Sequence, residues 1–382
     1  MKFADHPLWL AGFRPFFALA CLAGMSLPMI WALTFSGALP APTGPFSMIQ
    51  WHAHEMFFGF GWAVLGGFLL TATKNWVSIR GHHGRALIFL ATAWFLERLG
   101  MAWAGSLPPW LFRLSNNLFL VSIVLMLLHT LIRHRAQDSY RDNYFFLLVL
   151  PAFLVAKQLL LAPETFAIGV GITLGLFRMA FLVMFERTLT QFMKSVFQVS
   201  ILRHPLLDTA IKGLGLLLVL QPLLPPLVGA TLALGLALLL TFRFCFWKPL
   251  LGLSRLDIGV MYLGYLAITA QLCLEFLQQV APVAWVGSLS VHVFTFGAMG
   301  LVIPAMLIRI AKGHTGRKVV FEPLDKLALW FMILAFVVRI LLPQIYPAGY
   351  THWIHLAASC WLACFGLLGW RLIPFLLAPR VD

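Results

Sequence analysis

Apolar runs of roughly 18–25 residues recur from one end of this chain to the other, and a helix that crosses a bilayer needs about that length. Inside lipid every backbone polar group must be satisfied within the segment, so only helices and closed barrels can cross. The alternating pattern of a lipid-facing barrel strand is absent. Only 10% of the residues are charged, against about a quarter in soluble domains. The chain is therefore predicted to be an all-α integral membrane protein, a polytopic bundle of about twelve transmembrane helices.

The predicted spans follow one another closely along the chain. They lie near residues 13–36, 50–72, 85–104, 116–135, 143–162, 166–190, 206–223, 226–247, 257–279, 289–311, 324–343 and 351–378. No soluble domain fits between them, so we predict a single transmembrane helical domain over residues 1–382. The first residues lack a small-residue cleavage site at the expected distance, and we expect them to be retained with the first span.

The charged residues give an orientation. Lys and Arg number 27 against 13 Asp and Glu, and most lie in loops after even-numbered spans, such as "TKNWVSIRGHHGR" and "RIAKGHTGRKVV". Loops after odd-numbered spans hold Arg113, Glu164 and little else. The positive-inside rule therefore predicts that both termini are cytoplasmic. Because the net charge of +14 is spread over short loops, it does not indicate binding to nucleic acid.

The segment "WHAHEMFFGF" places polar side chains at the outer end of the second span. Ser47 followed by Gln50 is a capping-box pattern, which predicts a helix start near Met48. His52 and His54 then lie in the second turn. They are two residues apart, roughly 200° around a helix, so we predict that they face different ways and do not share one metal. They suit separate roles, such as two different centres, or a ligand and its supporting residue.

Three further histidines are predicted at the same depth. His292 lies near the outer end of the tenth span, and His352 and His355 lie in the first turns of the last span, where Thr351 is a candidate N-cap. Imidazole is a common ligand for haem iron and copper, and the spacing of His352 and His355 suits two ligands to one copper. The alternative is that each histidine is a satisfied polar residue at the interface. Five together favour function, because polar groups in a membrane are costly.

Charged residues within the spans extend this set. Glu97 and Arg98 lie in the outer half of the third span, and Arg339 lies in the outer half of the eleventh. Both arginines suit the propionates of a haem through charge-assisted hydrogen bonds. The alternatives are mutual pairing, such as Glu97 with a neighbouring arginine, or snorkelling to the interface.

Other polar residues raise separate questions. Arg178 lies near the middle of the sixth span, so it needs a partner or a water-filled cavity, and Lys157 and Glu275 raise the same question. At the inner end of the tenth span, Gly313 has the position of a helix C-cap, and His314 is predicted to stabilise that helix end. A metal-binding role for His314 stays open.

Five motifs occur in order along the chain: "FRPFF", "WHAHEMFFGF", "GGFLLTATKNW", "HVFTFGAMG" leading to "RIAKGHTGR", and "PFLLAPRVD". Together they resemble the NnrS family over essentially the whole chain. The resemblance implies a bacterial inner-membrane protein of twelve helices that contains haem (haem b) and copper and is linked to nitric oxide in denitrification or nitrosative stress. The family's motif histidines correspond to His52, His54, His292 and His314, whereas His352 and His355 rest on position alone.

The sequence leads to two function hypotheses. The first is a haem protein, with copper, that binds or reduces nitric oxide or relieves nitrosative stress. Turnover as a nitric oxide reductase-type enzyme would need a quinol or another electron donor, with Glu55, Glu97 and Glu275 as carboxylates for proton delivery. Binding without catalysis stays open. The second is a twelve-helix secondary transporter of a small solute or metal, with the histidines as substrate or proton sites. Pro304 and "QPLLPP" favour it, but no convincing internal repeat is visible.

Overall fold

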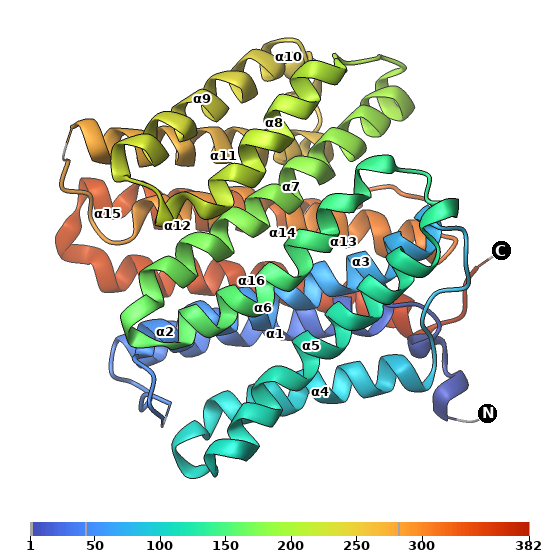
Figure 1. Ribbon diagram of the computed structural model, residues 1–382, viewed down its shortest axis with the longest axis horizontal. Coiled ribbons are helices and arrows are strands. Elements are labelled where there is room, and N and C mark those ends of the chain that lie inside the picture. The colour runs from blue at the N-terminus through green and yellow to red at the C-terminus, as the bar shows by residue number, and fades with distance from the viewer. Residues whose placement is uncertain (1–2, 43, 282, 382) are drawn as a thin grey trace. The chain divides into compact units, whose positions relative to one another are not determined.

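The computed structural model describes residues 3–42, 44–281 and 283–381. In this part of the chain 82% of the residues are helical and no strand is present (Figure 1). Eleven helical stretches within these described ranges are long and apolar enough to cross a membrane. The chain is therefore an all-helical, multi-pass membrane protein, as predicted.

The helices follow the chain without a sheet. The α-helices are α1 (Phe13–Phe35), α2 (Met48–His54), α3 (Trp62–Trp76), α4 (Arg85–Ala102), α5 (Pro109–Arg133), α6 (Phe146–Leu161), α7 (Phe166–Phe197), α8 (Pro205–Leu217), α9 (Pro226–Cys245), α10 (Pro249–Leu253), α11 (Leu256–Val280), α12 (Leu289–His292), α13 (Leu301–His314), α14 (Pro323–Ile340), α15 (Leu342–Ile345) and α16 (Tyr350–Leu377). Two π-helices are η3 (Glu55–Gly61) and η9 (Val293–Gly300). The 3₁₀ turns are η1 (Phe3–Asp5), η2 (Pro7–Trp9), η4 (Ala104–Ser106), η5 (Arg135–Gln137), η6 (Arg141–Phe145), η7 (Pro163–Thr165), η8 (Leu218–Leu223) and η10 (Pro347–Gly349).

The observed helices match the predicted spans with three notable differences. The second span is longer than expected, because α2, η3 and α3 form one continuous stretch from Met48 to Trp76. The sixth extends to Phe197. The predicted third span is α4, which is a helix but is less apolar than the eleven because it carries Arg85, Glu97 and Arg98.

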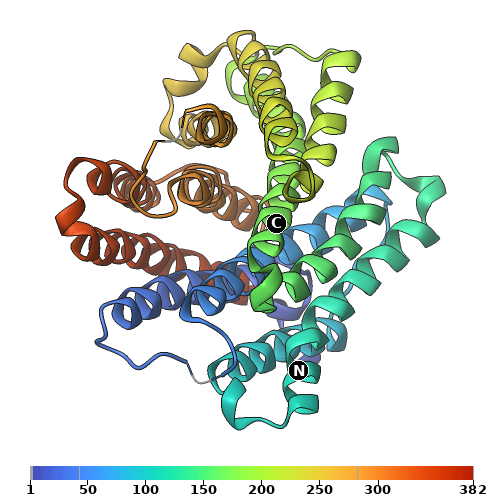
Figure 2. The same ribbon diagram turned by 60° about the vertical axis from the view of Figure 1, so that its left-hand side comes forward.

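Contacts divide the chain into two compact units. Unit 1 comprises Met1–Gly169, Leu307–Val320 and Phe365–Asp382, and unit 2 comprises Val170–Met306 and Phe321–Cys364. In unit 1, α1 packs along α3 and η3, and α4 packs along α5. In unit 2, α11 packs against both α9 and η9, and α14 packs against η9 (Figure 2). The single domain over residues 1–382 stays a prediction.

Small residues set the closeness of packing in unit 1. A Cβ placed on Gly67 of α3 would lie 2.7 Å from the Cβ of Phe16 in α1, so no larger residue fits without a shift. Helices in membranes pack through such small residues, because lipid gives little hydrophobic drive for association. This contact explains why the second position of the "GGFLL" motif is a glycine.

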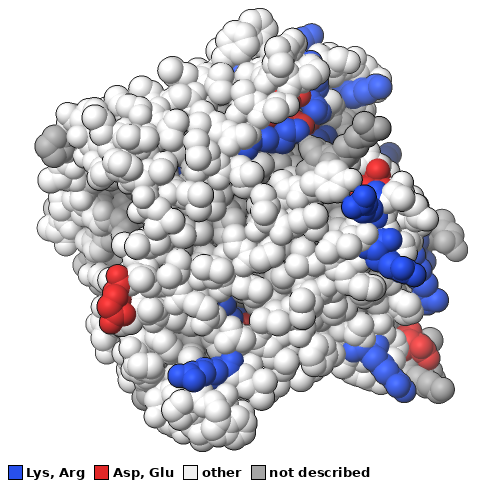
Figure 3. All heavy atoms as spheres, in the orientation of Figure 1, with Lys and Arg blue, Asp and Glu red and all other residues white. Residues whose placement is uncertain are grey.

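Basic residues gather at one end of unit 1. The first and last described residues both belong to this unit and lie at the same end of it (Figure 1). Figure 3 shows Lys and Arg atoms around that end and few at the opposite end. This is the asymmetry expected from the loop sequences. Which side of the membrane this end faces stays a prediction.

Two predicted helix starts have different outcomes. The capping box is confirmed: the Gln50 N–H donates to Ser47 Oγ at 3.2 Å, and the Ser47 N–H donates to Gln50 Oε1 at 2.9 Å. The N-cap at Thr351 is wrong, because α16 begins at Tyr350 and Thr351 lies inside its first turn. The preceding turn η10 brings the chain into helical geometry one residue earlier than the side-chain preference indicated.

The end of α13 corrects another prediction. The helix continues through Gly313 to His314, and it is Gly316 that takes a left-handed φ of +80°. The Arg317 N–H donates to the Lys312 carbonyl at 2.9 Å, which is the bond that closes a Schellman motif. The C-terminal glycine is therefore Gly316. The "GHTGR" motif is a helix end, and its second glycine supplies the backbone freedom.

Candidate functional site

Two histidines mark places where an α-helix passes into a π-helix. In unit 1, α2 ends at His54 and η3 follows; in unit 2, α12 ends at His292 and η9 follows. Both junctions carry the pattern His-x-x-x-Phe-Gly, as "HEMFFG" and "HVFTFG". π-helical segments are rare and occur frequently at functional sites. The two junctions are therefore the candidate functional sites of the chain.

The phenylalanine of the pattern supports the histidine ring at both junctions. The ring centroids of His54 and Phe58 lie 5.6 Å apart, and those of His292 and Phe296 lie 5.9 Å apart. The planes are tilted by 35° and 45°. Each histidine thus has the same aromatic neighbour one helical turn further along.

The glycine of the pattern makes room for a neighbouring helix. A Cβ on Gly59 would lie 2.7 Å from an Arg98 guanidinium nitrogen of α4. A Cβ on Gly297 would lie 2.4 Å from the Cβ of Ala267 in α11. The glycine therefore admits a cationic side chain in unit 1 and a helix backbone in unit 2.

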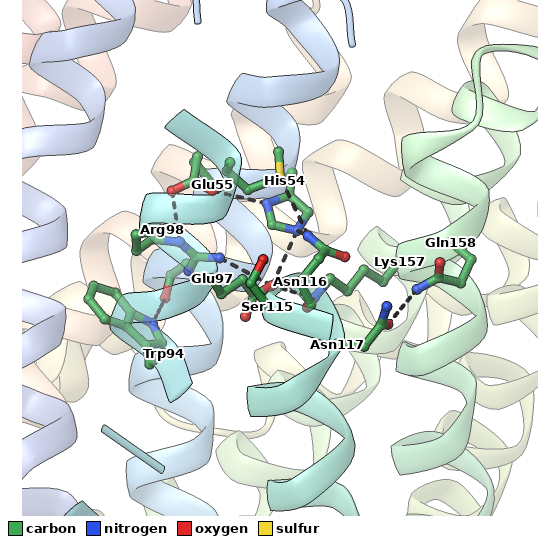
Figure 4. A network of polar contacts seen from close by, with 12 residues as sticks. His54, Glu55, Trp94, Glu97, Arg98, Ser115, Asn116, Asn117, Lys157 and Gln158 are labelled. Atoms are coloured by element: carbon green, nitrogen blue, oxygen red, sulfur yellow. Dashed lines mark hydrogen bonds and ion pairs between the residues drawn. The ribbon is translucent and has the colours of Figure 1, made fainter. Parts of the chain in front are cut away.

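In unit 1, His54 is fully buried with polar neighbours at both ring nitrogens (Figure 4). Nδ1 lies 3.0 Å from Glu55 Oε1, and Nε2 lies 3.2 Å from Asn116 Nδ2 and 3.3 Å from Glu97 Oε1. An ionised carboxylate only accepts hydrogen bonds and an amide nitrogen only donates them. Neutral His54 with its proton on Nδ1 therefore satisfies both Glu55 and Asn116.

Two cations hold the carboxylates of this network. Lys157 Nζ contacts Glu97 Oε1, and Arg98 lies 3.2 Å from the same oxygen. The Nε of Arg98 lies 2.9 Å from Glu55 Oε2. Lys157 also donates to the backbone carbonyl of Asn116. Two carboxylates and two cations balance, so the network is neutral when His54 is neutral, which is the condition under which buried charges are tolerated.

The structure favours one of the alternatives for Arg98. Its guanidinium pairs with Glu55 and Glu97 and lies 5.2 Å from the ring centre of Trp94. This is the mutual pairing that was the alternative to a propionate contact. The structure therefore brings four predicted site residues together, and their polar groups pair with one another: His54, Glu55, Glu97 and Arg98.

In unit 2, His292 has a different setting. Its Nδ1 lies 2.8 Å from the Ser288 carbonyl oxygen, which only accepts, so the proton is on Nδ1 and the lone pair is on Nε2. Nε2 lies 3.4 Å from an Arg339 guanidinium nitrogen, and that nitrogen lies 3.1 Å from the Tyr350 hydroxyl. The predicted residues His292 and Arg339 are therefore neighbours, and His292 is only half-buried.

The tautomer of His292 is the one expected of a histidine that binds haem iron through Nε2. A ligating histidine usually donates its other ring N–H to a carbonyl or carboxylate, which fixes the tautomer and the ring orientation. The Ser288 carbonyl does this for His292. At His54 the Nε2 is enclosed by Asn116 and Glu97, so the ring has no open side for a large ligand. The tautomer of His292 suits a ligand to haem iron, which would require Arg339 to withdraw from Nε2, whereas His54 belongs to a buried polar network.

His52 lies apart from His54, as predicted. Its ring stacks on Trp31 of α1, with centroids 4.1 Å apart and planes tilted by 21°. His54 instead faces α4 and α5 through Glu97 and Asn116. The prediction that the two histidines face different ways is confirmed.

The other candidate histidines lie elsewhere in the fold. His352 and His355 occupy the first turns of α16 in unit 2, the first exposed and the second half-buried. His314 ends α13 in unit 1, with its ring 5.4 Å from that of Phe13. Across the described ranges, no three or more His, Cys, Asp and Glu side chains form a group that could hold a metal ion.

Sequence reasoning missed Asn116, which joins α5 to the His54 network. A signal was available: Asn116 and Asn117 stand side by side where an apolar span begins, and such polar residues need partners. Lys157 was noted only as an unexplained charge, and its partner Glu97 lies in another helix.

One protein-family profile matches nearly all of the chain. The sequence profile of the family described as NnrS protein matches residues 7–380, nearly the whole chain. No curated protein sequence matches the chain. The matched range contains both histidine junctions.

Proposed function

Because the chain belongs to the NnrS family, we propose that it is a haem-binding protein of the bacterial inner membrane, with copper, that binds or reduces nitric oxide and so relieves nitrosative stress. The observation that carries the proposal is the setting of His292. Its Nδ1 is held by a backbone carbonyl, its Nε2 has the lone pair, and it begins a π-helix. These are features expected of a histidine that would hold a haem iron.

Each nearby residue has a defined task in this proposal. His292 would hold the haem through Nε2, from which Arg339 would have to withdraw, and Arg339 and Tyr350 would then be donors for the propionates, as cationic and hydroxyl groups are. When bound, the haem would supply an iron that takes nitric oxide. His352 and His355 are the residues at which we would test for copper, since they share one helix face.

The His54 network is proposed to serve proton delivery if nitric oxide is reduced. Reduction joins two nitric oxide molecules with two electrons and two protons to give nitrous oxide and water. Glu55 and Glu97 lie on either side of His54, at 3.0 and 3.3 Å from its ring nitrogens. A protonated His54 would lie between two carboxylates, so the network can hold one added proton. A quinol or another donor would supply the electrons.

The test is an optical spectrum of the purified full-length protein, oxidised and dithionite-reduced, with iron and copper analysis. A Soret band that shifts on reduction and on addition of nitric oxide is expected. A well-folded protein with no Soret band and no copper would refute the proposal. Multiple turnovers with a quinol donor would establish reduction, whereas stoichiometric binding alone would leave a sensor or buffer.

A further inference from the structure

Arg178 of α7 is a buried cation that the proposed function does not use. It is 2% exposed and belongs to unit 2. Its guanidinium lies 2.9 Å from Gln271 Oε1 and 3.4 Å from Glu275 Oε2, both in α11. It also lies 3.5 Å from Gln221 Oε1 in η8. An arginine inside a membrane span points to a functional site, because its burial is costly.

A broken helix supplies one side of this site. The α-helix α8 gives way to the 3₁₀ segment η8, which contains Pro222. Pro222 has no N–H, so the Leu218 carbonyl cannot accept the α-helical bond from it. Arg178 lies 3.4 Å from that carbonyl oxygen instead. Gly175 lets α7 come close, since a Cβ there would lie 2.8 Å from the Cα of Val219.

The hydrogen-bond donors of Arg178 are poorly matched by the residues around them. A guanidinium has five N–H donors. Only the contact to Gln271 is short; the other three are 3.4–3.5 Å, which is long for a charge-assisted bond. The Nε of Arg178 is buried and has no hydrogen-bond partner among the described residues. A well-formed structural ion pair would be short and bidentate, so the guanidinium has hydrogen-bonding capacity left for another acceptor.

We infer that Arg178, Gln221, Gln271 and Glu275 form a binding site for a small monovalent anion, which binds together with a proton on Glu275. The site is neutral when Glu275 is ionised. An added anion would leave a net negative charge in a buried place, and one proton on the carboxylate cancels it. The anion then accepts the hydrogen bond that the Arg178 guanidinium directs at Glu275 in the absence of the anion.

Glu275 is suited to this exchange. Its contact to Arg178 is long, and its side chain is 18% exposed while that of Arg178 is 3% exposed. Gln271 donates from Nε2 to Glu275 Oε1, so the amide can stay with the carboxyl group in either protonation state. Among the described residues, the charged group that contacts Glu275 is Arg178 of α7, and the other polar groups named at the site are neutral amides and a backbone carbonyl. This inference does not depend on haem.

The experiment measures anion-dependent thermal unfolding of the purified full-length protein in detergent, with chloride and nitrate as probes and gluconate and sulfate as controls. The unaltered protein should show a saturable stabilisation by the monovalent probes. As the pH rises, the apparent affinity should weaken by up to about tenfold for each pH unit, because one proton is bound with each anion. Stabilisation that is equal with gluconate or sulfate would overturn the inference.

Two variants and two controls separate the roles. Arg178→Gln should abolish the stabilisation, whereas Arg255→Gln, which removes an exposed arginine, should keep it. Glu275→Gln resembles the protonated carboxyl group, so it should bind the probes with little dependence on pH. If Arg178→Gln does not fold, Glu275→Gln alone decides: an unchanged pH dependence would refute the inference. His292→Ala should keep the effect, which separates this site from anion binding at a haem.

Discussion

The two histidine junctions share a motif and differ in their surroundings. His54 is followed by Glu55 and is enclosed by ion pairs, whereas His292 is followed by Val293 and stays half-buried beside Arg339. The pattern His-x-x-x-Phe-Gly fixes the ring, the π-helix and the close approach of a neighbour. It does not fix the chemistry. The residues that neighbouring helices place around the ring decide whether the histidine joins a network of ion pairs or lies beside a single guanidinium.

The largest effect is expected where the His54 network loses one charge. Glu97→Gln or Lys157→Met should each lower the free energy of unfolding by about 3–5 kcal/mol, because the remaining partner is left buried and unbalanced. The double variant restores neutrality, so its loss should be clearly smaller than the sum. Chemical unfolding in detergent measures all three. Strictly additive losses would show that the two residues are not coupled, and Arg255→Gln serves as an exposed control.

The same comparison predicts which histidine a haem needs. His292→Ala should remove or alter the Soret band at little cost in stability, because the ring is half-buried. His54→Ala should keep the band and unfold more easily, because Glu55 and Asn116 lose a partner inside the protein. Spectra and unfolding curves recorded on the same samples check this. Loss of the band in His54→Ala alone would reverse the assignment of the two junctions.

Alanine substitutions at the glycines of the two patterns should differ in their cost to stability. At Gly297 an added methyl group meets the Cβ of Ala267 at 2.4 Å, and neither helix backbone can move easily. At Gly59 it meets the flexible end of Arg98 at 2.7 Å. Gly297→Ala should therefore cost about 1–3 kcal/mol, and Gly59→Ala should cost less. Thermal unfolding of both variants is the measurement, and a larger loss at Gly59 would mean that Arg98 is held rigidly by its ion pairs.

Helix starts and side-chain directions could be predicted from local sequence patterns, whereas contacts between distant helices could not. The Ser47 capping box and the opposite directions of His52 and His54 depend on a few neighbouring residues and the geometry of one helix. The pairing of Glu97 with Lys157 joins two helices far apart in sequence, so no spacing indicates it. The π-helices were not predicted, because the pattern His-x-x-x-Phe-Gly that both carry also suits a regular α-helix. At "GHTGR" two glycines compete, and the bond from Arg317 to Lys312 selects Gly316.

The smallest effect concerns the serines that begin α2 and α12. Ser47 accepts a hydrogen bond from the Gln50 N–H, so Ser47→Ala should cost about 1 kcal/mol. Ser288 holds the equivalent N-cap position but makes no side-chain capping bond. It acts through its carbonyl, which His292 Nδ1 contacts and which alanine keeps. Ser288→Ala should therefore change stability by less than about 0.5 kcal/mol and leave any haem spectrum unaltered. An equal loss in both variants would mean that the Ser288 hydroxyl supports the junction, and the contrast drawn between the two helix starts would fail.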